Sequence, residues 1–316
     1  MPAVVSHYLL AERVINKLGP EIAADRNAFL WGANGPDIFF AHRVMPWQRQ
    51  PSIAKISHIM HNGYAEPLLN YLYEYSSVND DKSAMSYTFG FVTHYAFDSV
   101  AHPYIVSYAE RMSEGKMVHL PLVGRANEQI ADGIKMSSVY HNKLEGELDT
   151  ILLKHELNIS IHKFRLENAC PDNSDTYQKT AEILSAYLID SGIYPEIQKH
   201  EIIRAQLDWR NCVTALNDRF SFKIKSLKAL EHILHIPPLV SVFVRSIDID
   251  YSQDPANFQH SPWKAPADGT MHYESFLDLV DIAEEKSLYL INKLRCGEML
   301  TRNDCFDGFS GHGTND

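Results

Sequence analysis

Three polar side chains recur every four residues within the apolar segment Phe89–Ile105, namely His94, Asp98 and His102. If this segment is helical, residues four apart lie one turn above each other, so the three side chains share one face. Imidazole nitrogens and a carboxylate are ligands that Zn²⁺ takes, and two residues four apart can bind one ion. Two ions could share the carboxylate. The spacing therefore predicts a metal-binding face.

These residues also have a purely structural interpretation. The histidines could be core residues that are hydrogen-bonded to the backbone, with Asp98 as a local cap or ion-pair partner. For a single buried histidine we would favour that interpretation. Burying a carboxylate among Phe, Val, Ala and Tyr is costly unless it is paired or binds a metal. Three residues of ligand type on one face therefore favour the metal.

A second segment, Met136–Leu153, repeats the spacing of four with His141, Glu145 and Asp149. The first two would lie one helical turn apart, which is the geometry of half a zinc site. An exposed ion pair is the alternative, and this segment alone would favour it. We interpret Asp149 as a group behind the ligands or on the surface.

His7 lies near the start of the first predicted helix. We expect Ser6 to cap this helix and Gly19-Pro20 to end it. A histidine in such a first turn is usually an ordinary surface residue, so His7 alone carries little weight.

Two further candidates lie in the following loops. Asp37 comes directly after the turn formers Gly32–Pro36, and from this loop alone a simple Pro-Asp turn is slightly favoured. His58 and His61 lie three apart before a helical run. Either could complete a metal shell or be a surface residue, and we favour His61.

The elements that must position these residues are predicted to be helices. Helical periodicity covers Tyr8–Leu18, Glu21–Trp31, Tyr64–Tyr75, Met136–Leu153, Thr180–Gly192, Pro195–Leu216, Phe220–Leu234 and Tyr273–Leu294. We expect Pro103 to separate the central helix from another helix, with a loop near Leu120–Gly124. Leu239–Phe243 could be a short strand or a buried helical turn, and Asp248–Gly269 a long loop. Since no stretch alternates with period two, we predict an all-α protein.

Composition excludes some classes of protein. The chain of 316 residues is 45% hydrophobic and 22% charged, as is ordinary for a globular protein. Its net charge of -11 argues against binding to a nucleic-acid backbone. The four cysteines form no CxxC pair, so neither a disulfide framework nor a thiolate zinc site is indicated, and a reducing compartment is expected.

We expect a cytoplasmic protein without a membrane span. The N-terminal segment lacks the basic leader of a secretory signal. The apolar run Ile236–Val244 is too short to cross a bilayer and contains two prolines.

Taken in order, the ligand-type residues resemble those of the zinc-dependent phospholipase C family, which is related to the P1-type nucleases and to the N-terminal domain of glycosylphosphatidylinositol phospholipase D. The residues that carry the resemblance are His7, Asp37, His58 or His61, His94, Asp98, His102, His141 and Glu145. The Gly-Pro-Asp loop adds to the resemblance. The resemblance covers residues 1–155. The stretch Trp263–Leu294 also resembles the C-terminal part of bacterial members.

This resemblance implies an all-helical bundle around a cluster of two or three zinc ions. One ion would be held by Asp37, His61, His94 and Asp98, the second by His102, His141 and Glu145, and the third by His7 and the bridging Asp98. In secreted members the third ion also takes the mature N-terminal Trp, and here its occupancy stays open. We expect a single domain over residues 1–301, with the metal-site half at 1–155, its helical completion at 156–301, and a flexible tail at 302–316.

The implied activity is hydrolysis of a phosphodiester by a metal-activated water, with Asp37 as the candidate general base. The substrate would be a phospholipid, reached by peripheral membrane contact, or a soluble phosphodiester. A nuclease-type or nucleotide-type enzyme would need an aromatic slot, for which Phe39, Phe40, Tyr64 and Trp263 are candidates. A non-catalytic metal-binding protein is the other alternative. A His-Asp phosphohydrolase is disfavoured because the chain has no adjacent His-Asp pair.

Overall fold

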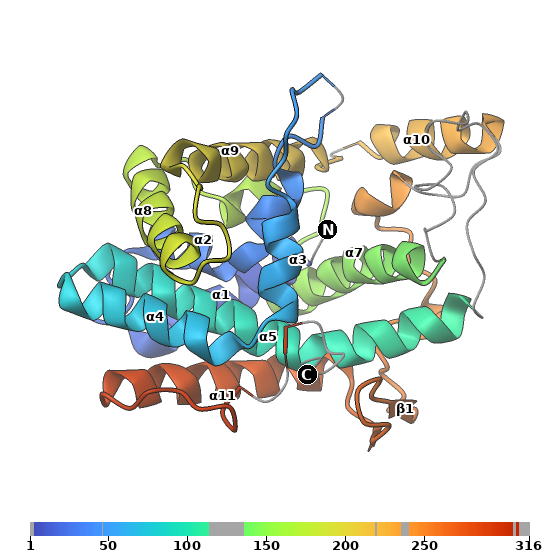
Figure 1. Ribbon diagram of the computed structural model, residues 1–316. Helices are drawn as coiled ribbons and strands as arrows, with labels where there is room; N and C mark the ends of the chain where they lie inside the picture. Colours follow the sequence, from blue (N-terminus) through green and yellow to red (C-terminus); the bar gives the residue numbers. More distant parts are fainter. Residues whose placement is uncertain are drawn as a thin grey trace.

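The computed structural model describes residues 3–45, 47–113, 136–218, 220–234, 240–305 and 308–309, and these are predominantly helical (Figure 1). The α-helices are α1 (Val4–Leu18), α2 (Arg26–Ala33), α3 (Lys55–Asn62), α4 (Ala65–Val78), α5 (Lys82–Ser113), α7 (Met136–Leu157), α8 (Ser174–Asp190), α9 (Lys199–Ala215), α10 (Phe222–Ile233) and α11 (Phe276–Arg295). The 3₁₀ turns are η1 (Gly35–Ala41), η3 (Leu166–Ala169), η4 (Ser241–Phe243) and η5 (Tyr251–Gln253). Within these ranges the only strands are β1 (Trp263–Lys264) and β2 (Met271–His272), which pair antiparallel. The predicted all-α class is confirmed.

Helix α5 forms the centre of the bundle. It packs against α2, α4, α7 and α11, and α1 also contacts it (Figure 1). Its middle section is buried almost all round, because the sequence there is apolar on every side apart from the predicted ligands. The predicted metal-binding face therefore lies inside the molecule.

Helices α2 and α5 cross with their backbones in contact at Gly32 and Gly90. A Cβ atom at Gly32 would lie 2.0 Å from the carbonyl oxygen of Tyr87, and one at Gly90 would lie 2.0 Å from that of Phe29. Only glycine permits this approach. The crossing brings η1, which directly follows α2, over the middle of α5.

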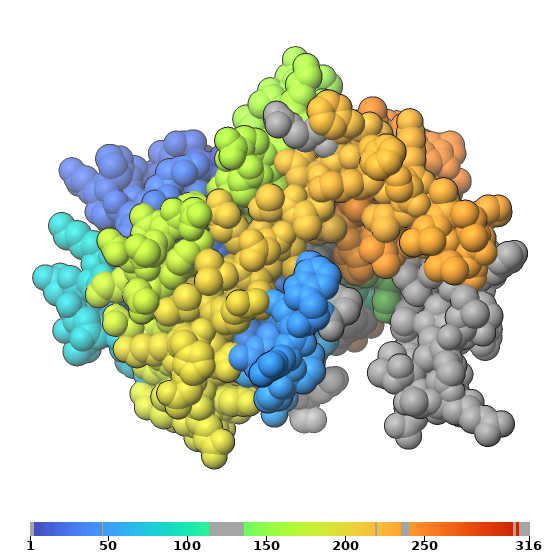
Figure 2. All heavy atoms as spheres, turned by 90° about the horizontal axis from the view of Figure 1, so that it is seen from above, coloured from blue at the N-terminus to red at the C-terminus, as the bar shows by residue number. Residues whose placement is uncertain are grey.

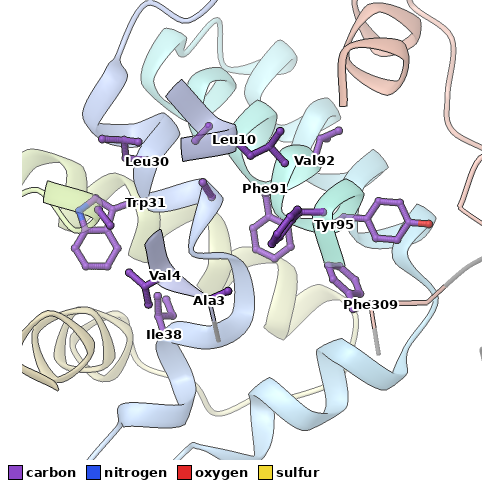
Figure 3. Packing of buried hydrophobic residues seen from close by; sticks show 14 of the residues in the cluster. Ala3, Val4, Leu10, Leu30, Trp31, Ile38, Phe91, Val92, Tyr95 and Phe309 are labelled. Atoms are coloured by element: carbon purple, nitrogen blue, oxygen red, sulfur yellow. The ribbon is translucent and has the colours of Figure 1, made fainter. Parts of the chain in front are cut away.

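Buried side chains from distant segments meet beside α5 (Figure 3). Leu10 of α1, Phe91 of α5 and Phe309 near the C-terminus are fully buried members of one core cluster. This cluster includes residues on both sides of residue 155. The single domain over 1–301 stays a prediction, but its two halves share apolar packing.

The segment expected to be a flexible tail is described at residues 302–305 and 308–309. Cys305 and Phe309 are buried in the core there. Residues 306, 307 and 310–316 lie outside the described residues, as does the predicted loop at Leu120–Gly124.

Several predicted element boundaries are wrong. Helix α1 begins at Val4, so Ser6 lies inside it. The amide and hydroxyl of Ser6 both donate to Asp149, and Ser6 does not cap the helix. Helix α2 begins only at Arg26, after the cap Asp25.

Pro103 does not divide the central helix, which continues from Lys82 to Ser113. A proline inside a helix costs roughly 3 kcal/mol. Packing of α5 against its neighbours outweighs that cost. For Leu239–Phe243 the sequence left a short strand and a helical turn open. Its residues Ser241–Phe243 form the helical turn η4 and not a strand.

Helix α10 and the loop 42–52 lie on the same face of the molecule (Figures 1 and 2). In Figure 2 the loop is blue and α10 is orange. No helix among the described residues combines the length and the apolar character that crossing a bilayer requires.

Candidate metal centre

The structure brings all eight predicted ligands together around the middle of α5. They come from five elements: His7 from α1, Asp37 from η1, His61 from α3, His94, Asp98 and His102 from α5, and His141 and Glu145 from α7. Short nitrogen–oxygen contacts connect them without a break, from His7 through Asp98 to His102, Glu145 and His141.

Asp98 is the hub of this cluster. Its Oδ1 lies 3.1 Å from Nε2 of His7, and its Oδ2 lies 3.1 Å from Nε2 of His94. The same Oδ2 is 3.7 Å from Nε2 of His61 and 3.9 Å from Nδ1 of His102. Since each oxygen faces different histidines, this carboxylate has the geometry to bridge two cations.

Three groups of ligand atoms are compact enough to hold one ion each. They are His7, His94 and Asp98; Asp37, His61 and His94; and His102, His141 and Glu145, with the ligand atoms of each group within 4.8 Å of one another. Around tetrahedral zinc, with bonds of about 2.0–2.1 Å, ligand atoms lie roughly 3.3 Å apart. Nε2 of His61 is 3.1 Å from Oδ1 of Asp37, and Nε2 of His102 is 3.7 Å from Oε1 of Glu145. These separations fit zinc.

Several polar atoms of the cluster residues make no hydrogen bond among the described residues. Nδ1 of His7, Oδ1 of Asp37, Nε2 of His94, Oδ2 of Asp98 and Oε2 of Glu145 are all buried without a hydrogen-bond partner. Buried polar atoms are normally satisfied, and leaving one unsatisfied costs about 1–3 kcal/mol. Such a concentration of buried, unsatisfied nitrogen and oxygen atoms fits a set of cation ligands.

Main-chain carbonyl oxygens orient three of the histidines. Nδ1 donates to Ala33 in His94 (3.1 Å), to Ser57 in His61 (2.7 Å) and to Phe309 in His102 (2.6 Å). A carbonyl oxygen only accepts, so each Nδ1 carries a proton and Nε2 is the nitrogen that faces the cluster. Metal-binding histidines usually have this arrangement.

Gly35 gives His94 the space for its ring. Its φ of +51° lies in the left-handed region, and a Cβ atom there would be 2.3 Å from Cδ2 of His94. Glycine is therefore required both by the backbone conformation and by the contact. The Gly-Pro-Asp motif thus makes room for one ligand and supplies Asp37 two residues later.

Asp149 lies behind the ligands, which is one of its two predicted placements. It is fully buried, and its Oδ1 accepts hydrogen bonds from the amide (2.8 Å) and hydroxyl (2.9 Å) of Ser6. Its Oδ2 accepts from Nε (3.0 Å) and Nη2 (2.9 Å) of Arg245. Burial raises the pKa of Asp149, and Arg245 opposes that rise. Because Ser6 precedes His7, this buried pair helps to position His7.

Two carboxylates of the cluster, Asp98 and Glu145, have pKa values below their ordinary values. Burial raises the pKa of Asp98, but the charges of His94 and His102 and a hydrogen bond from His7 hold it well below its ordinary value. Burial likewise raises the pKa of Glu145, and His141 and His102 more than reverse that effect. Burial lowers the pKa of His102, whereas Asp98 and Glu145 raise it to about 10. A bound cation would take the place of the proton on His102.

His58 lies outside the three groups. It is exposed, and its ring packs edge-on against Phe40 with ring centroids 5.0 Å apart. His61, the alternative to His58 as a predicted ligand, lies in the group with Asp37.

Sequence reasoning missed three residues that support the centre: Gly35, Arg245 and Phe309. From the sequence, the Gly-Pro-Asp motif indicates a turn and a carboxylate, but not the contact of Gly35 with His94. Arg245 directly follows the apolar run Ile236–Val244, which is a weak signal for a buried pair. Phe309 lies in a Gly- and Asp-rich segment, and nothing in the local pattern indicated burial.

A model of one protein family, described as zinc dependent phospholipase C, matches residues 6–191, which is more than half of the chain. The match includes all eight residues of the cluster. Neither the curated proteins nor the solved structures contain a match to this chain.

Proposed function

The chain belongs to the zinc-dependent phospholipase C family, and from this we propose that it is a zinc-dependent phosphodiester hydrolase whose substrate is a phospholipid or a related phosphodiester. The observation that carries the proposal is the set of three compact ligand groups, two of which share His94. A phosphodiester is an anion, and hydrolysis builds further negative charge on its oxygens. A buried cluster that can hold several cations suits that chemistry.

The ligand sets follow the three groups. Asp37, His61, His94 and Asp98 would hold one ion; His102, His141 and Glu145 would hold the second; His7 and Asp98 would hold the third, with Asp98 bridging. Zinc in these positions would lower the pKa of a bound water and neutralise charge on the phosphate.

We assign Asp37 the role of general base. Its Oδ1 makes no hydrogen bond among the described residues and lies 3.1 Å from Nε2 of His61. An ionised carboxylate in that position can accept a proton from the attacking water and hold it while the ester bond breaks. His61 would keep the carboxylate oriented, because its own Nδ1 is fixed by the carbonyl oxygen of Ser57.

The substrate would approach from the side of His102 and His141. The side chain of His141 is 27% exposed and that of His102 is 13% exposed, whereas the side chains of His94 and Asp98 are almost completely buried. The phosphate would therefore meet this end of the cluster first.

A lipid-type phosphodiester is favoured over a nucleic acid because the predicted base slot has little support. Phe39 and Trp263 are buried in the core, and the Trp263 ring already stacks on His272. Phe40 packs against His61, and Arg302 lies over the ring of Tyr64. We also propose a cytoplasmic location, which the four free cysteines support.

The first test is elemental analysis of the purified protein together with hydrolysis of bis-p-nitrophenyl phosphate and p-nitrophenyl phosphorylcholine. We expect about two or three zinc ions per chain, hydrolysis that stops on chelation, and recovery when zinc is returned. His94→Ala should lose metal and activity, whereas His200→Ala, which removes an exposed histidine of α9, should keep both. Zinc binding without hydrolysis of any phosphodiester would leave the non-catalytic alternative.

A further inference from the structure

Helix α10 is attached to the rest of the molecule along one narrow line. Its only buried residues are Ile224 and Glu231, which are seven apart and so lie on one side of the helix. Oε1 of Glu231 accepts hydrogen bonds from the main-chain amides of Val240 (2.7 Å) and Ser241 (3.0 Å). The opposite side of α10 faces solvent.

That opposite side is mainly apolar, with the exposed Ser226 among its apolar residues. Phe222, Ala229 and Ile233 follow one another at helical intervals on it, and Leu230 lies beside them. Phe222 is 73% exposed, and Phe220, just before the helix, is 87% exposed. We call Phe220, Phe222, Leu230 and Ile233 the α10 apolar face. Proteins rarely leave a contiguous apolar surface of this kind in water unless something docks on it.

Basic side chains border this face. Lys225 and Lys228 lie on the exposed part of α10, whereas Nζ of Lys223 donates to the carbonyl oxygens of Ala215 and Asn217; the only acidic residue of α10, Glu231, is buried. This local positive charge contrasts with the net charge of -11 of the whole chain. An apolar stripe flanked by lysines is typical of helices that lie in the interface of a membrane with anionic lipids.

A second exposed apolar point lies on the same face of the molecule. Trp47, in the loop 42–52, is 80% exposed, and Val44 is also exposed. Figures 1 and 2 show this loop and α10 as separate projections on one face. Two separate points with an aromatic residue at each suit a flat surface better than a peptide that fills a groove.

The face is also connected to the metal centre. Helix α10 packs on η4, and η4 packs on α7, which carries His141 and Glu145. The carbonyl oxygen of Val242 in η4 lies 3.7 Å from the position of a Cβ at Gly146, the residue after Glu145. Helix α10 is thus linked through η4 to the helix that carries His141 and Glu145.

We propose that the α10 apolar face and Trp47 dock the protein on a phospholipid bilayer that contains anionic lipids. The apolar side chains would enter the boundary between headgroups and acyl chains, and Lys225 and Lys228 would contact lipid phosphates. A second copy of the chain fits less well, because a symmetric contact would place the lysines of one α10 against those of the other. The inference rests on the proposed function, since a bilayer would then present the substrate.

Sedimentation with vesicles tests this proposal. Zinc-loaded protein is mixed with vesicles of phosphatidylcholine containing phosphatidylglycerol. The double variant Phe220→Ser/Phe222→Ser should partition onto them at least tenfold less than the parent. A matched control, Val78→Ser/Ile189→Ser, removes two exposed apolar residues from α4 and α8 and should change partitioning less than twofold. Lys225→Glu/Lys228→Glu should weaken binding several-fold, and added salt should reduce that difference.

Three results would overturn the proposal: no binding by the parent, equal losses in the test and control pairs, or a dimer of the parent that Phe220→Ser/Phe222→Ser dissociates. Unchanged zinc content and melting temperature of the variants establish that they fold. Lipid hydrolysis is scored separately. Vesicle binding without hydrolysis of any phosphodiester supports docking and contradicts the proposed function, whereas hydrolysis of p-nitrophenyl phosphorylcholine without vesicle binding contradicts docking alone.

Discussion

Nδ1 of His102 lies 2.6 Å from the carbonyl oxygen of Phe309, a residue 207 positions further along the chain. The ring of Phe309 is fully buried, with its centroid 5.7 Å from the ring of His61 and 5.9 Å from that of His94. One residue near the C-terminus thus orients one candidate ligand through its backbone and covers two others with its side chain.

Phe309→Ala should lower both stability and zinc retention. Removing a buried phenylalanine costs about 3–5 kcal/mol, and the collapse of the site would misplace the carbonyl oxygen that holds His102. Phe309→Leu should cost less, because it fills most of the cavity. Urea unfolding and zinc content measure the two effects. Phe164→Ala, which removes a buried ring that packs on Tyr8, should destabilise the protein but release less zinc.

Asp37 and Asp98 should respond differently to substitution. Asp37→Asn removes the proposed base, so turnover should fall by about 10²–10⁴-fold with zinc content only partly reduced. Asp98→Ala removes the hub of the contacts with His7 and His94, so at least one zinc ion should be lost. Elemental analysis together with kinetics on bis-p-nitrophenyl phosphate distinguishes loss of zinc from loss of turnover in the two variants. Equal zinc loss in both variants would make Asp37 a ligand only.

Gly35→Ala should be far more damaging than Gly19→Ala. Both glycines have positive φ values, +51° and +76°, so alanine costs about 1 kcal/mol at either position. A Cβ at Gly19 meets nothing within 4 Å, whereas one at Gly35 meets the His94 ring at 2.3 Å. Gly35→Ala should therefore displace His94 and reduce zinc binding at least tenfold. Similar zinc titrations for the two variants would show that the contact has no role in metal binding.

The stability of the loop after η1 should depend on pH through His42. This buried ring accepts a hydrogen bond from the amide of Ile53 at Nδ1 (3.1 Å), and its Nε2 lies 2.9 Å from Oε2 of Glu201. Burial lowers the pKa of His42, although Glu201 opposes this. Above about pH 6.5 both the folded and the unfolded ring are neutral. Below it the unfolded chain takes up the proton first, so the free energy of unfolding falls, by up to about 1.4 kcal/mol per pH unit.

His42→Gln, which can still accept and donate, should flatten this dependence. Urea unfolding at pH 7.5 and 5.5 compares the two proteins, because the remaining titrating groups are the same in both. The free energy of unfolding of the variant should be lower at pH 7.5, but it should fall less between pH 7.5 and pH 5.5. Parallel curves would mean that another group causes the pH dependence.

The cluster on α5 could be predicted because residues four apart on a helix must share a face, whatever else surrounds them. Long-range contacts could not be predicted this way. Serine is a common helix cap, but the hydroxyl of Ser6 donates to Asp149, 143 positions away. Pro103 looks like a helix end, yet the packing of α5 keeps the helix intact. The burial of Phe309 depends on the path of the chain after α11, which the local sequence does not encode.

The three carbonyl oxygens that hold His94, His61 and His102 belong to the main chain of Ala33, Ser57 and Phe309. Every amino acid has that oxygen. At Ala33 and Ser57 a side chain of similar size and shape would leave the acceptor in place, whereas at Phe309 the buried ring also keeps the backbone in position. The path of the backbone, and not the identity of a side chain, therefore sets the orientation of these histidine rings. Residue identities at Ala33 and Ser57 in relatives would say little about that orientation.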